Sequence, residues 1–333
     1  MSTSGFVRID DQWVHRGLRT IVLENDRIRV EILPELGARV NRIEHRASGV
    51  DLLWHNPRVE PRIVPIGASY DDNFAGGWDE LFPNDLAGVV GGETYPDHGE
   101  LWCQPWQYRL EAASPDEVAV TLSRTGAVTT SLVEKRVSLR RGESQLRFAH
   151  RITNKDHTAL SFLWKLHPAL AIDAGDQIDV PARRAEIVDP AFGRISQPST
   201  FAWPIAPVPG AAAIDASVVP PLDGTRDFLY LNDLAEGWCA LRRLRHGLGF
   251  GMVFPLDVFP NVWLFMSFGG WRGHETVVLE PCTTVPKDLN EAIRRGTART
   301  LVAGATLACE VRAVLFEGTD AVSGFDAVGN PIC

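Results

Sequence analysis

Hydrophobic and polar residues alternate along most of this chain. The alternation is clear at residues 28–32, 118–122, 146–152, 248–254, 262–268 and 307–315. Successive side chains of a β-strand point to opposite faces, so this two-residue period predicts strands with one buried face. Turn-forming residues separate the stretches, and Arg141-Gly142-Glu143 is predicted to close a hairpin between the strands around Val137 and Phe148.

Signals for helices are scarce by comparison. One short helix is predicted, with Asp288 as its N-cap and Gly296 at its end. Many strands without crossover helices imply antiparallel pairing, because parallel strands need long and usually helical connections. We therefore predict an all-β fold, a large antiparallel β-sandwich in a single domain over residues 1–333, in which the Pro-rich segment 201–221 is a long surface loop.

Charge and cysteine content narrow the partners and the location. The chain has 33 Lys and Arg against 42 Asp and Glu, a formal net charge of −9, and its basic residues are scattered, which argues against nucleic acid as a partner. We find no run of about 18 apolar residues that could span a membrane, and residues 1–13 are too polar for a signal peptide. The 5 cysteines form no C-x-x-C pair, which favours a reducing compartment, so we predict a cytoplasmic protein.

Common catalytic motifs are missing: there is no G-x-x-x-x-G-K-[ST], no H-E-x-x-H and no G-x-S-x-G. Ionisable residues nevertheless stand at three places where a β scaffold could aim them into a cleft. His98 lies in a turn before an aromatic segment, and Lys165 and His167 share one face of a predicted strand. Glu280 ends an apolar strand just before Pro281. For each histidine, a hydrogen-bonded core residue is the competing interpretation.

Short motifs surround these residues. They are Gly76-Gly77-Trp78-Asp79-Glu80-Leu81-Phe82-Pro83, His98-Gly99-Glu100-Leu101-Trp102, Pro105-Trp106, Leu166-His167-Pro168-Ala169-Leu170, Asp227-Phe228-Leu229-Tyr230-Leu231 and Leu279-Glu280-Pro281. Together they resemble the motifs of the aldose 1-epimerase (galactose mutarotase-like) superfamily, over residues 28–316. The resemblance implies a large antiparallel β-sandwich with these residues in its concave face.

Anomer interconversion, the activity that this resemblance implies, requires few groups. The C1 hydroxyl must lose its proton and the ring oxygen must gain one, so one base and one acid suffice and no cofactor is expected. The segments that resemble the family's base and acid assign Glu280 as the base and His167 as the acid. His98 would bond a sugar oxygen, and Asp227 would orient hydroxyl groups.

Further residues near the motifs are candidates for binding the substrate. Trp78 and Trp102 could stack on the sugar ring, with packing in the core as the competing interpretation. Asp79 and Glu80 could bind hydroxyl groups or lie in a solvated acidic loop. Lys165 is a candidate because it shares a strand face with His167.

The expected ligand is a small, neutral carbohydrate. In the branch of the superfamily that acts on hexose 6-phosphates, arginines stand at two positions where this chain has Ala75 and Trp102. Arginine's planar fork is the usual partner of phosphate, so a fixed phosphate clamp is missing. The sugar's identity and the oligomeric state stay open, a homodimer included.

Two other function classes remain. His98, His167 and Glu280 also make a two-histidine, one-carboxylate set, which is the composition of a non-haem iron or hydrolytic zinc site, although no His-x-His pair is present. Alternatively the protein binds a carbohydrate or has a regulatory role without turnover, because a fold does not fix an activity.

Overall fold

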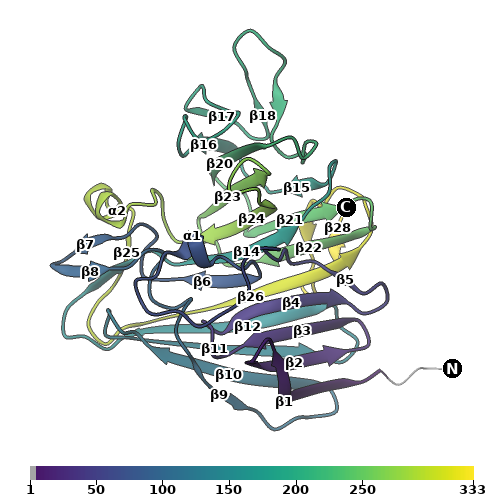
Figure 1. The fold of residues 1–333 in the computed structure, drawn as a ribbon, viewed down its shortest axis with the longest axis vertical. Coiled ribbons are helices and arrows are strands. Elements are labelled where there is room, and N and C mark those ends of the chain that lie inside the picture. The colour runs from purple at the N-terminus through teal and green to yellow at the C-terminus, as the bar shows by residue number, and fades with distance from the viewer. Residues whose placement is uncertain (1–4) are drawn as a thin grey trace.

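The computed structural model describes residues 5–333, and its regular secondary structure consists almost entirely of β-strands (Figure 1). Strands hold 48% of the residues and helices 3%, which confirms the predicted all-β class. The strands form a 12-stranded sheet, an 8-stranded sheet and 4 two-stranded ribbons. The pairings along both large sheets are antiparallel.

One edge strand of the larger sheet comes from the N-terminal part of the chain, and the opposite edge strand comes from the middle of the chain. In spatial order its strands are β1 (Val7–His15), β2 (Leu18–Asn25), β3 (Ile28–Leu33), β4 (Arg39–His45), β6 (Trp78–Leu81), β14 (Lys165–Ala171), β24 (Glu275–Cys282), β23 (Asn261–Phe268), β20 (Thr225–Asn232), β16 (Arg184–Ile187) and β17 (Thr200–Ala202), with β5 (Val50–Asp51) paired to β4. Segments far apart in the sequence, β6, β14 and β24, therefore meet at its centre.

The smaller sheet covers one face of the larger one. Its strands, in spatial order, are β15 (Gln177–Asp179), β21 (Trp238–Arg243), β22 (Leu248–Val253), β26 (Thr306–Glu317), β12 (Gln145–Asn154), β11 (Ser131–Arg140), β10 (Glu117–Thr125) and β9 (Gln107–Leu110). The ribbons are β7 (Gly88–Val90) with β8 (Glu93–Tyr95), β13 (Leu160–Phe162) with β25 (Arg299–Leu301), β18 (Ile205–Ala206) with β19 (Ile214–Asp215), and β27 (Gly324–Phe325) with β28 (Pro331–Ile332). The helices are α1 (Tyr70–Asn73) and α2 (Leu289–Arg295).

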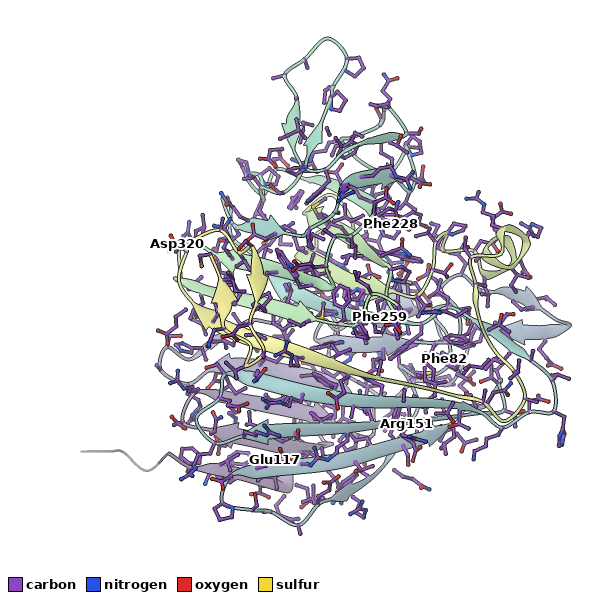
Figure 2. All side chains as sticks on the ribbon, turned by 180° about the vertical axis from the view of Figure 1, so that it is seen from behind. Phe82, Glu117, Arg151, Phe228, Phe259 and Asp320 are labelled. Carbon is purple, nitrogen blue, oxygen red and sulfur yellow. The ribbon has the colours of Figure 1, made fainter. Side chains whose placement is uncertain are left out.

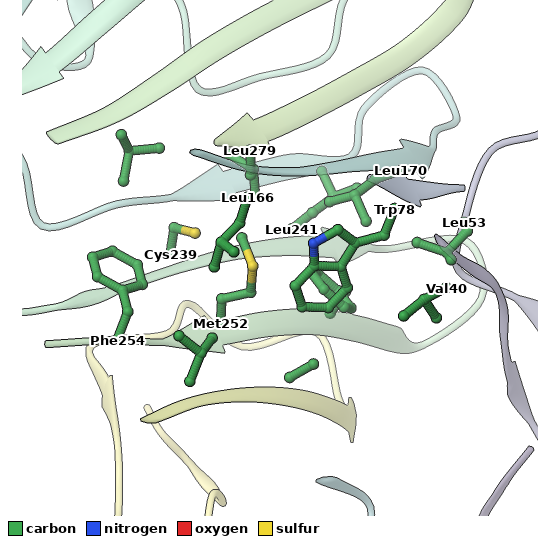
Figure 3. Packing of buried hydrophobic residues seen from close by; sticks show 14 of the residues in the cluster. Val40, Leu53, Trp78, Leu166, Leu170, Cys239, Leu241, Met252, Phe254 and Leu279 are labelled. Carbon is green, nitrogen blue, oxygen red and sulfur yellow. The ribbon is translucent and has the colours of Figure 1, made fainter. Parts of the chain in front are cut away.

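The hydrophobic core lies between the two sheets. Figure 3 shows Trp78, Leu166 and Leu279 of the larger sheet facing Leu241 and Met252 of the smaller one. Every second residue of these strands faces inward, and most of these inward residues are apolar, as the alternation predicts. Burying each such side chain contributes roughly 1.5–3 kcal/mol, so the packed sandwich is the main source of stability.

The outer face of the smaller sheet is charged. Figure 2 shows this face, with Glu117 on β10 and Arg151 on β12 labelled. Glu117 forms ion pairs with Arg136 at 2.6 Å and Arg140 at 2.8 Å on the neighbouring strand. Within residues 5–333, no helix is long and apolar enough to cross a membrane.

Local sequence signals explain several connections. Val137 and Phe148 pair directly across the hairpin predicted at residues 141–143. The predicted helix is α2, in which the Asp288 side chain accepts a hydrogen bond from the Glu291 amide and Gly296 adopts a φ of 71°. Both predictions are confirmed.

The segment 201–221 differs from the prediction of one long surface loop. Residues 200–202 form the edge strand β17, and β18 and β19 pair into a short ribbon. Ala206, Ala216 and Val219 are buried. Edge strands tolerate proline because one side of their backbone has no strand to pair with, which is why a Pro-rich composition masked these elements.

Candidate functional site

A cavity of about 230 Å³ opens on the face of the larger sheet that points away from the core. It is lined by Tyr70, Asp71, Phe74, Asp85, Leu86, Asp97, His98, Lys165, His167, Asp189, Phe192, Phe228, Phe265, Trp271, Val278, Glu280 and Lys287. Clefts for drug-sized ligands measure roughly 300–1,000 Å³, so this one suits a smaller molecule.

Alternation along two neighbouring strands places three polar side chains in this cavity. On β14, Leu166 belongs to the core cluster, so its neighbours Lys165 and His167 point the other way. On β24, Leu279 packs in the core, so Glu280 points outward, on the same face as Lys165 and His167. Because β14 and β24 are adjacent in the sheet, the three polar side chains meet.

Lys165 joins two buried carboxylates. Its Nζ lies 2.7 Å from Glu280 Oε2 and 2.6 Å from Asp85 Oδ1, and 4.5 Å from the ring centre of Trp263. Burial alone would lower the pKa of the Lys165 ammonium, but the charges of Asp85 and Glu280 outweigh it and raise the pKa. The lysine is therefore a permanent cation at the floor of the cavity.

The two carboxylates that share this ammonium behave differently. Burial raises the pKa of Glu280 to about 7, against the opposing effect of Lys165. Burial would also raise the pKa of Asp85, but Lys165 and His98 outweigh it and lower the pKa. Glu280 is therefore the carboxyl group that exchanges its proton near neutral pH.

His98 closes another side of the cavity. Its Nδ1 lies 2.8 Å from Asp97 Oδ1, its Nε2 lies 3.7 Å from Asp85 Oδ1, and its ring stacks on Tyr70 with the centres 4.2 Å apart. Burial disfavours the charged ring, but Asp85 and the hydrogen bond to Asp97 outweigh this and raise the pKa of His98.

The backbone at His98 is held in an uncommon conformation. His98 has a φ of 58° and Gly99 a φ of 76°. A Cβ atom on residue 99 would lie 2.1 Å from the carbonyl oxygen of Phe82, so only glycine fits there. Such strain persists where the surroundings fix it and is concentrated at functional sites.

Each ring nitrogen of His167 faces a polar group. Its Nδ1 lies 3.2 Å from the hydroxyl of Tyr70, and its Nε2 lies 3.9 Å from Glu280 Oε2. Tyr70 and Phe74 contact the ring edge-on, each at 5.5 Å between centres. Burial, followed by the charges of Lys165 and His98, lowers the pKa of His167 well below its ordinary value.

Aromatic side chains form the remaining wall. Phe192, Phe228, Phe265 and Trp271 line the cavity, and the rings of Phe265 and Trp271 meet edge-to-face at 5.3 Å. Flat apolar surfaces beside a few polar groups suit a ligand that has both C–H faces and hydroxyl groups.

Known structures share this architecture. A candidate aldose 1-epimerase from Klebsiella pneumoniae superposes with a TM-score of 0.71 at 12% identity, covering 94% of this chain and 83% of that one. A galactose mutarotase-like protein from Clostridium acetobutylicum gives 0.65 at 12% identity, covering 94% and 99%. A galactose mutarotase related enzyme from Lactobacillus acidophilus gives 0.61 at 15% identity, covering 92% and 100%. No protein-family model matches the chain.

The chain has the galactose mutarotase-like fold. The sequence resemblance to the aldose 1-epimerase superfamily is thereby confirmed for the architecture. At such low identities the likeness shows the fold alone, so the chemistry of the site has to be argued from the residues themselves.

Within this galactose mutarotase-like fold, four of the site residues named from sequence line the cavity together. They are His98, Lys165, His167 and Glu280. The other five, Trp78, Asp79, Glu80, Trp102 and Asp227, lie outside the lining.

Trp78 and Glu80 point into the core. The Trp78 ring packs 4.8 Å from that of Phe148 between the sheets. Glu80 Oε1 lies 2.9 Å from Lys135 Nζ and 3.1 Å from His150 Nε2. Burial would raise the pKa of Glu80, but these two partners lower it, so the group is an anion within the core that does not line the cavity.

Asp227 also faces away from the cavity. Its carboxylate pairs with Arg194 and accepts a hydrogen bond from the Ile195 amide at 3.0 Å. Phe228, the next residue of β20, is the one that lines the cavity. Alternation on the strand thus places Asp227 on the face opposite to that of Phe228.

Asp79 and Trp102 lie behind the cavity wall. Asp79 accepts two hydrogen bonds from Arg39, at 2.7 and 2.6 Å, and one from the Tyr70 hydroxyl at 3.0 Å. The Trp102 ring meets Tyr70 edge-to-face at 5.0 Å. Both residues support Tyr70 instead of touching a ligand.

Sequence reasoning missed several lining residues. Tyr70, Asp85 and Lys287 lie in or next to loops, and no local pattern marks them. Phe228 and Phe265 could have been found, because they alternate with the core residues Leu229 and Leu264 on β20 and β23.

A metal centre was the alternative use of His98, His167 and Glu280. Across residues 5–333, no group of three or more His, Cys, Asp or Glu side chains has an arrangement that could hold a metal ion. The ammonium of Lys165 lies against Glu280 and Asp85, where it supplies the positive charge that these carboxylates need.

Proposed function

We propose that this protein is an aldose 1-epimerase-like isomerase that interconverts the α and β anomers of a neutral aldose. The observation that carries the proposal is the convergence of His98, His167 and Glu280 on one cavity. His167 Nε2 and Glu280 Oε2 are 3.9 Å apart, close enough to serve two oxygens bonded to the same carbon. The galactose mutarotase-like fold supports the same activity.

Ring opening needs two proton transfers, and the cavity offers a pair of groups for them. The hydroxyl on C1 loses its proton to one group, the bond between C1 and the ring oxygen breaks, and the ring oxygen gains a proton from the other. After rotation about C1–C2 the ring closes on the opposite face of the aldehyde, and both protons return. His167 and Glu280 are the acid-base pair in this proposal.

Neighbouring cations would assist the reaction. Lys165 and His98, whose pKa is raised by Asp85 and by the hydrogen bond to Asp97, lie on either side of Asp85 and face the cavity. Fixed positive charge in a buried site stabilises negative charge that develops on sugar oxygens in the transition state. His98 would bind a sugar oxygen, Lys165 would orient Glu280, and the aromatic wall would contact the C–H face of the ring.

The charges lining the cavity favour a neutral sugar over a phosphorylated one. Five carboxyl groups line it, from Asp71, Asp85, Asp97, Asp189 and Glu280, against the basic side chains His98, Lys165 and Lys287. No arginine lines it among the residues that the structure describes. A dianionic phosphate would meet net repulsion there.

A cytoplasmic location belongs to the same proposal. All 5 cysteines are free thiols, and Cys103, Cys239 and Cys282 are buried. Free thiols persist where the surroundings are reducing. The partner proposed is a small carbohydrate.

The test is anomer exchange measured by NMR over a panel of neutral aldoses and hexose phosphates. We expect exchange faster than in buffer for at least one neutral aldose, and a loss of roughly 10²–10⁴-fold in Glu280→Gln and His167→Gln. His157→Gln and Glu310→Gln, which change exposed residues of the same types, are the controls. A protein that binds a sugar but leaves its exchange at the buffer rate for the whole panel would be a carbohydrate-binding protein instead.

A further inference from the structure

A chain of buried hydrogen bonds ends on His167. Arg39 donates from Nε and an Nη atom to the two oxygens of Asp79, at 2.7 and 2.6 Å. The Tyr70 hydroxyl lies 3.0 Å from Asp79 Oδ2 and 3.2 Å from His167 Nδ1. All four side chains are buried.

We propose that Tyr70 and Asp79 are positioning residues that keep a proton on Nδ1 of His167, so that Nε2 is the ring nitrogen that exchanges a proton with the ligand. The hydrogen-bond directions stand by themselves, while the catalytic roles rest on the proposed anomer interconversion.

The direction of each hydrogen bond follows from the available donors. A guanidinium only donates, so the doubly bonded carboxylate of Asp79 is an acceptor. Tyr70 therefore gives its single hydroxyl proton to Asp79 Oδ2 and can only accept at its oxygen from His167. Hence Nδ1 of His167 must carry a proton, and Nε2 is the nitrogen left to exchange one.

Tyr70 is well fixed for this role. Its ring is stacked on His98 and held edge-on by Trp102 at 5.0 Å, and its amide donates to Asp97 Oδ2 at 3.1 Å. Burial, and then the charge of Asp79, raise the pKa of Tyr70 well above its ordinary value. The hydroxyl therefore keeps its proton at all working pH values.

The surroundings of His167 oppose a second proton on its ring. The charged and titratable groups that act on it are Lys165, His98, Arg39, Asp79, Tyr70 and Glu280. Burial lowers the pKa of His167 most, and the charges of Lys165 and His98 lower it further, so the resting imidazole is neutral. A neutral ring with its proton on Nδ1 presents a bare Nε2 to the cavity.

Glu280 holds the matching proton. The groups that act on its carboxyl are Lys165, Asp85, His98, His167 and Tyr70. Asp85 stays ionised beside Lys165 and His98, so its charge already neutralises the Lys165 ammonium. Glu280 therefore keeps its proton below its pKa of about 7. One mobile proton and one vacant acceptor thus stand 3.9 Å apart.

The resulting steps balance. One member of the His167–Glu280 pair takes the proton of the C1 hydroxyl, the C1 oxygen becomes the aldehyde oxygen as the bond from C1 to the ring oxygen breaks, and the other member protonates the ring oxygen. On closure, the ring oxygen attacks C1 and returns its proton to the group that supplied it, and the C1 oxygen takes its own proton back.

The first test is ¹⁵N NMR of the labelled full-length protein, with His167→Gln to assign the resonance. We expect the shifts of a neutral ring protonated on Nδ1 and bare on Nε2, and in Tyr70→Phe a mixture of the two tautomers. A wild-type ring protonated on Nε2 would overturn the proposal. This measurement needs no turnover, so it can fail while the proposed activity holds, and it can succeed in a protein without activity.

The second test is the pH profile of anomer exchange. The reaction needs one proton on the His167–Glu280 pair, so the rate is lost as pH rises through about 7, the pKa to which burial raises Glu280. A rate that stays constant or rises through this pH would contradict the shared proton. Tyr70→Phe should lower kcat by roughly 10–100-fold with KM little changed. Tyr108→Phe, at a tyrosine bonded to Asp11 outside the cavity, should leave kcat unchanged.

Discussion

Replacing Lys165 by methionine is the change that most directly probes the electrostatics of the site. The substitution keeps the length of the stem and removes the ammonium that pairs with Glu280 at 2.7 Å and Asp85 at 2.6 Å. Removing one partner of a buried ion pair costs roughly 3–5 kcal/mol, because the other charge is left uncompensated. We expect a loss of this size in the free energy of unfolding at pH 8, where both carboxyl groups are ionised.

The loss should shrink as pH falls. Burial raises the pKa of Glu280 to about 7, so at pH 5 this carboxyl is protonated in the folded protein and Lys165 compensates only Asp85. The cost should then be about half, since one of the two ion pairs no longer counts. Asp85 keeps its neighbour His98, whose Nε2 lies 3.7 Å away.

Urea unfolding followed by tryptophan fluorescence at pH 5 and pH 8 measures the difference. Lys155→Met, at an exposed lysine, is the matched control and should change the free energy of unfolding by about 0.5 kcal/mol or less. A loss in Lys165→Met that is equal at both pH values, or below about 1 kcal/mol at pH 8, would refute the reasoning.

Three other substitutions have definite outcomes. Gly99→Ala should lower stability by roughly 1–3 kcal/mol, because the new methyl group would lie 2.1 Å from the carbonyl oxygen of Phe82, and an unchanged melting temperature would contradict this. Trp78→Ala should cost roughly 3–5 kcal/mol in chemical unfolding, because it empties a core position, while sugar binding by the folded fraction stays unchanged. Phe228→Ala should do the reverse, raising KM severalfold in the anomer-exchange assay with little loss of stability, because its ring lines the cavity and lies off the main core.

The fold could be predicted because alternation is a local signal. Apolar residues recur at every second position of β23, and of β12 with His150 as the exception, and this sufficed for strands, hairpins and an antiparallel arrangement. The edge strand β17 was missed, because its short apolar pattern lies at the start of a Pro-rich stretch.

The site could be predicted only in part. His98, His167 and Glu280 were found from their motifs, but the face on which a side chain lies was not always readable. All four residues of β6 are buried, as is Asp227 on β20. Alternation there separates the residues into two faces, but it does not show which face packs in the core. That is why Trp78, Glu80 and Asp227 were chosen as ligand contacts although they face the interior.

Supporting residues are harder still to predict from sequence. Tyr70 is separated from His167 by 97 positions, and the pairing depends on a four-residue helix that packs over the sheet. No local pattern in the sequence encodes such a long-range contact. The tautomer of His167 became accessible only through the folded structure.

The most direct measurement is saturation transfer between the α and β C1 protons of an equilibrated aldose, with wild-type protein and with Glu280→Gln at equal concentration. We predict that wild-type protein carries saturation from one anomer to the other at pH 6 and that the variant does not. Equal transfer with both proteins, or none with either in the presence of a sugar that demonstrably binds, would contradict an acid-base pair formed by His167 and Glu280.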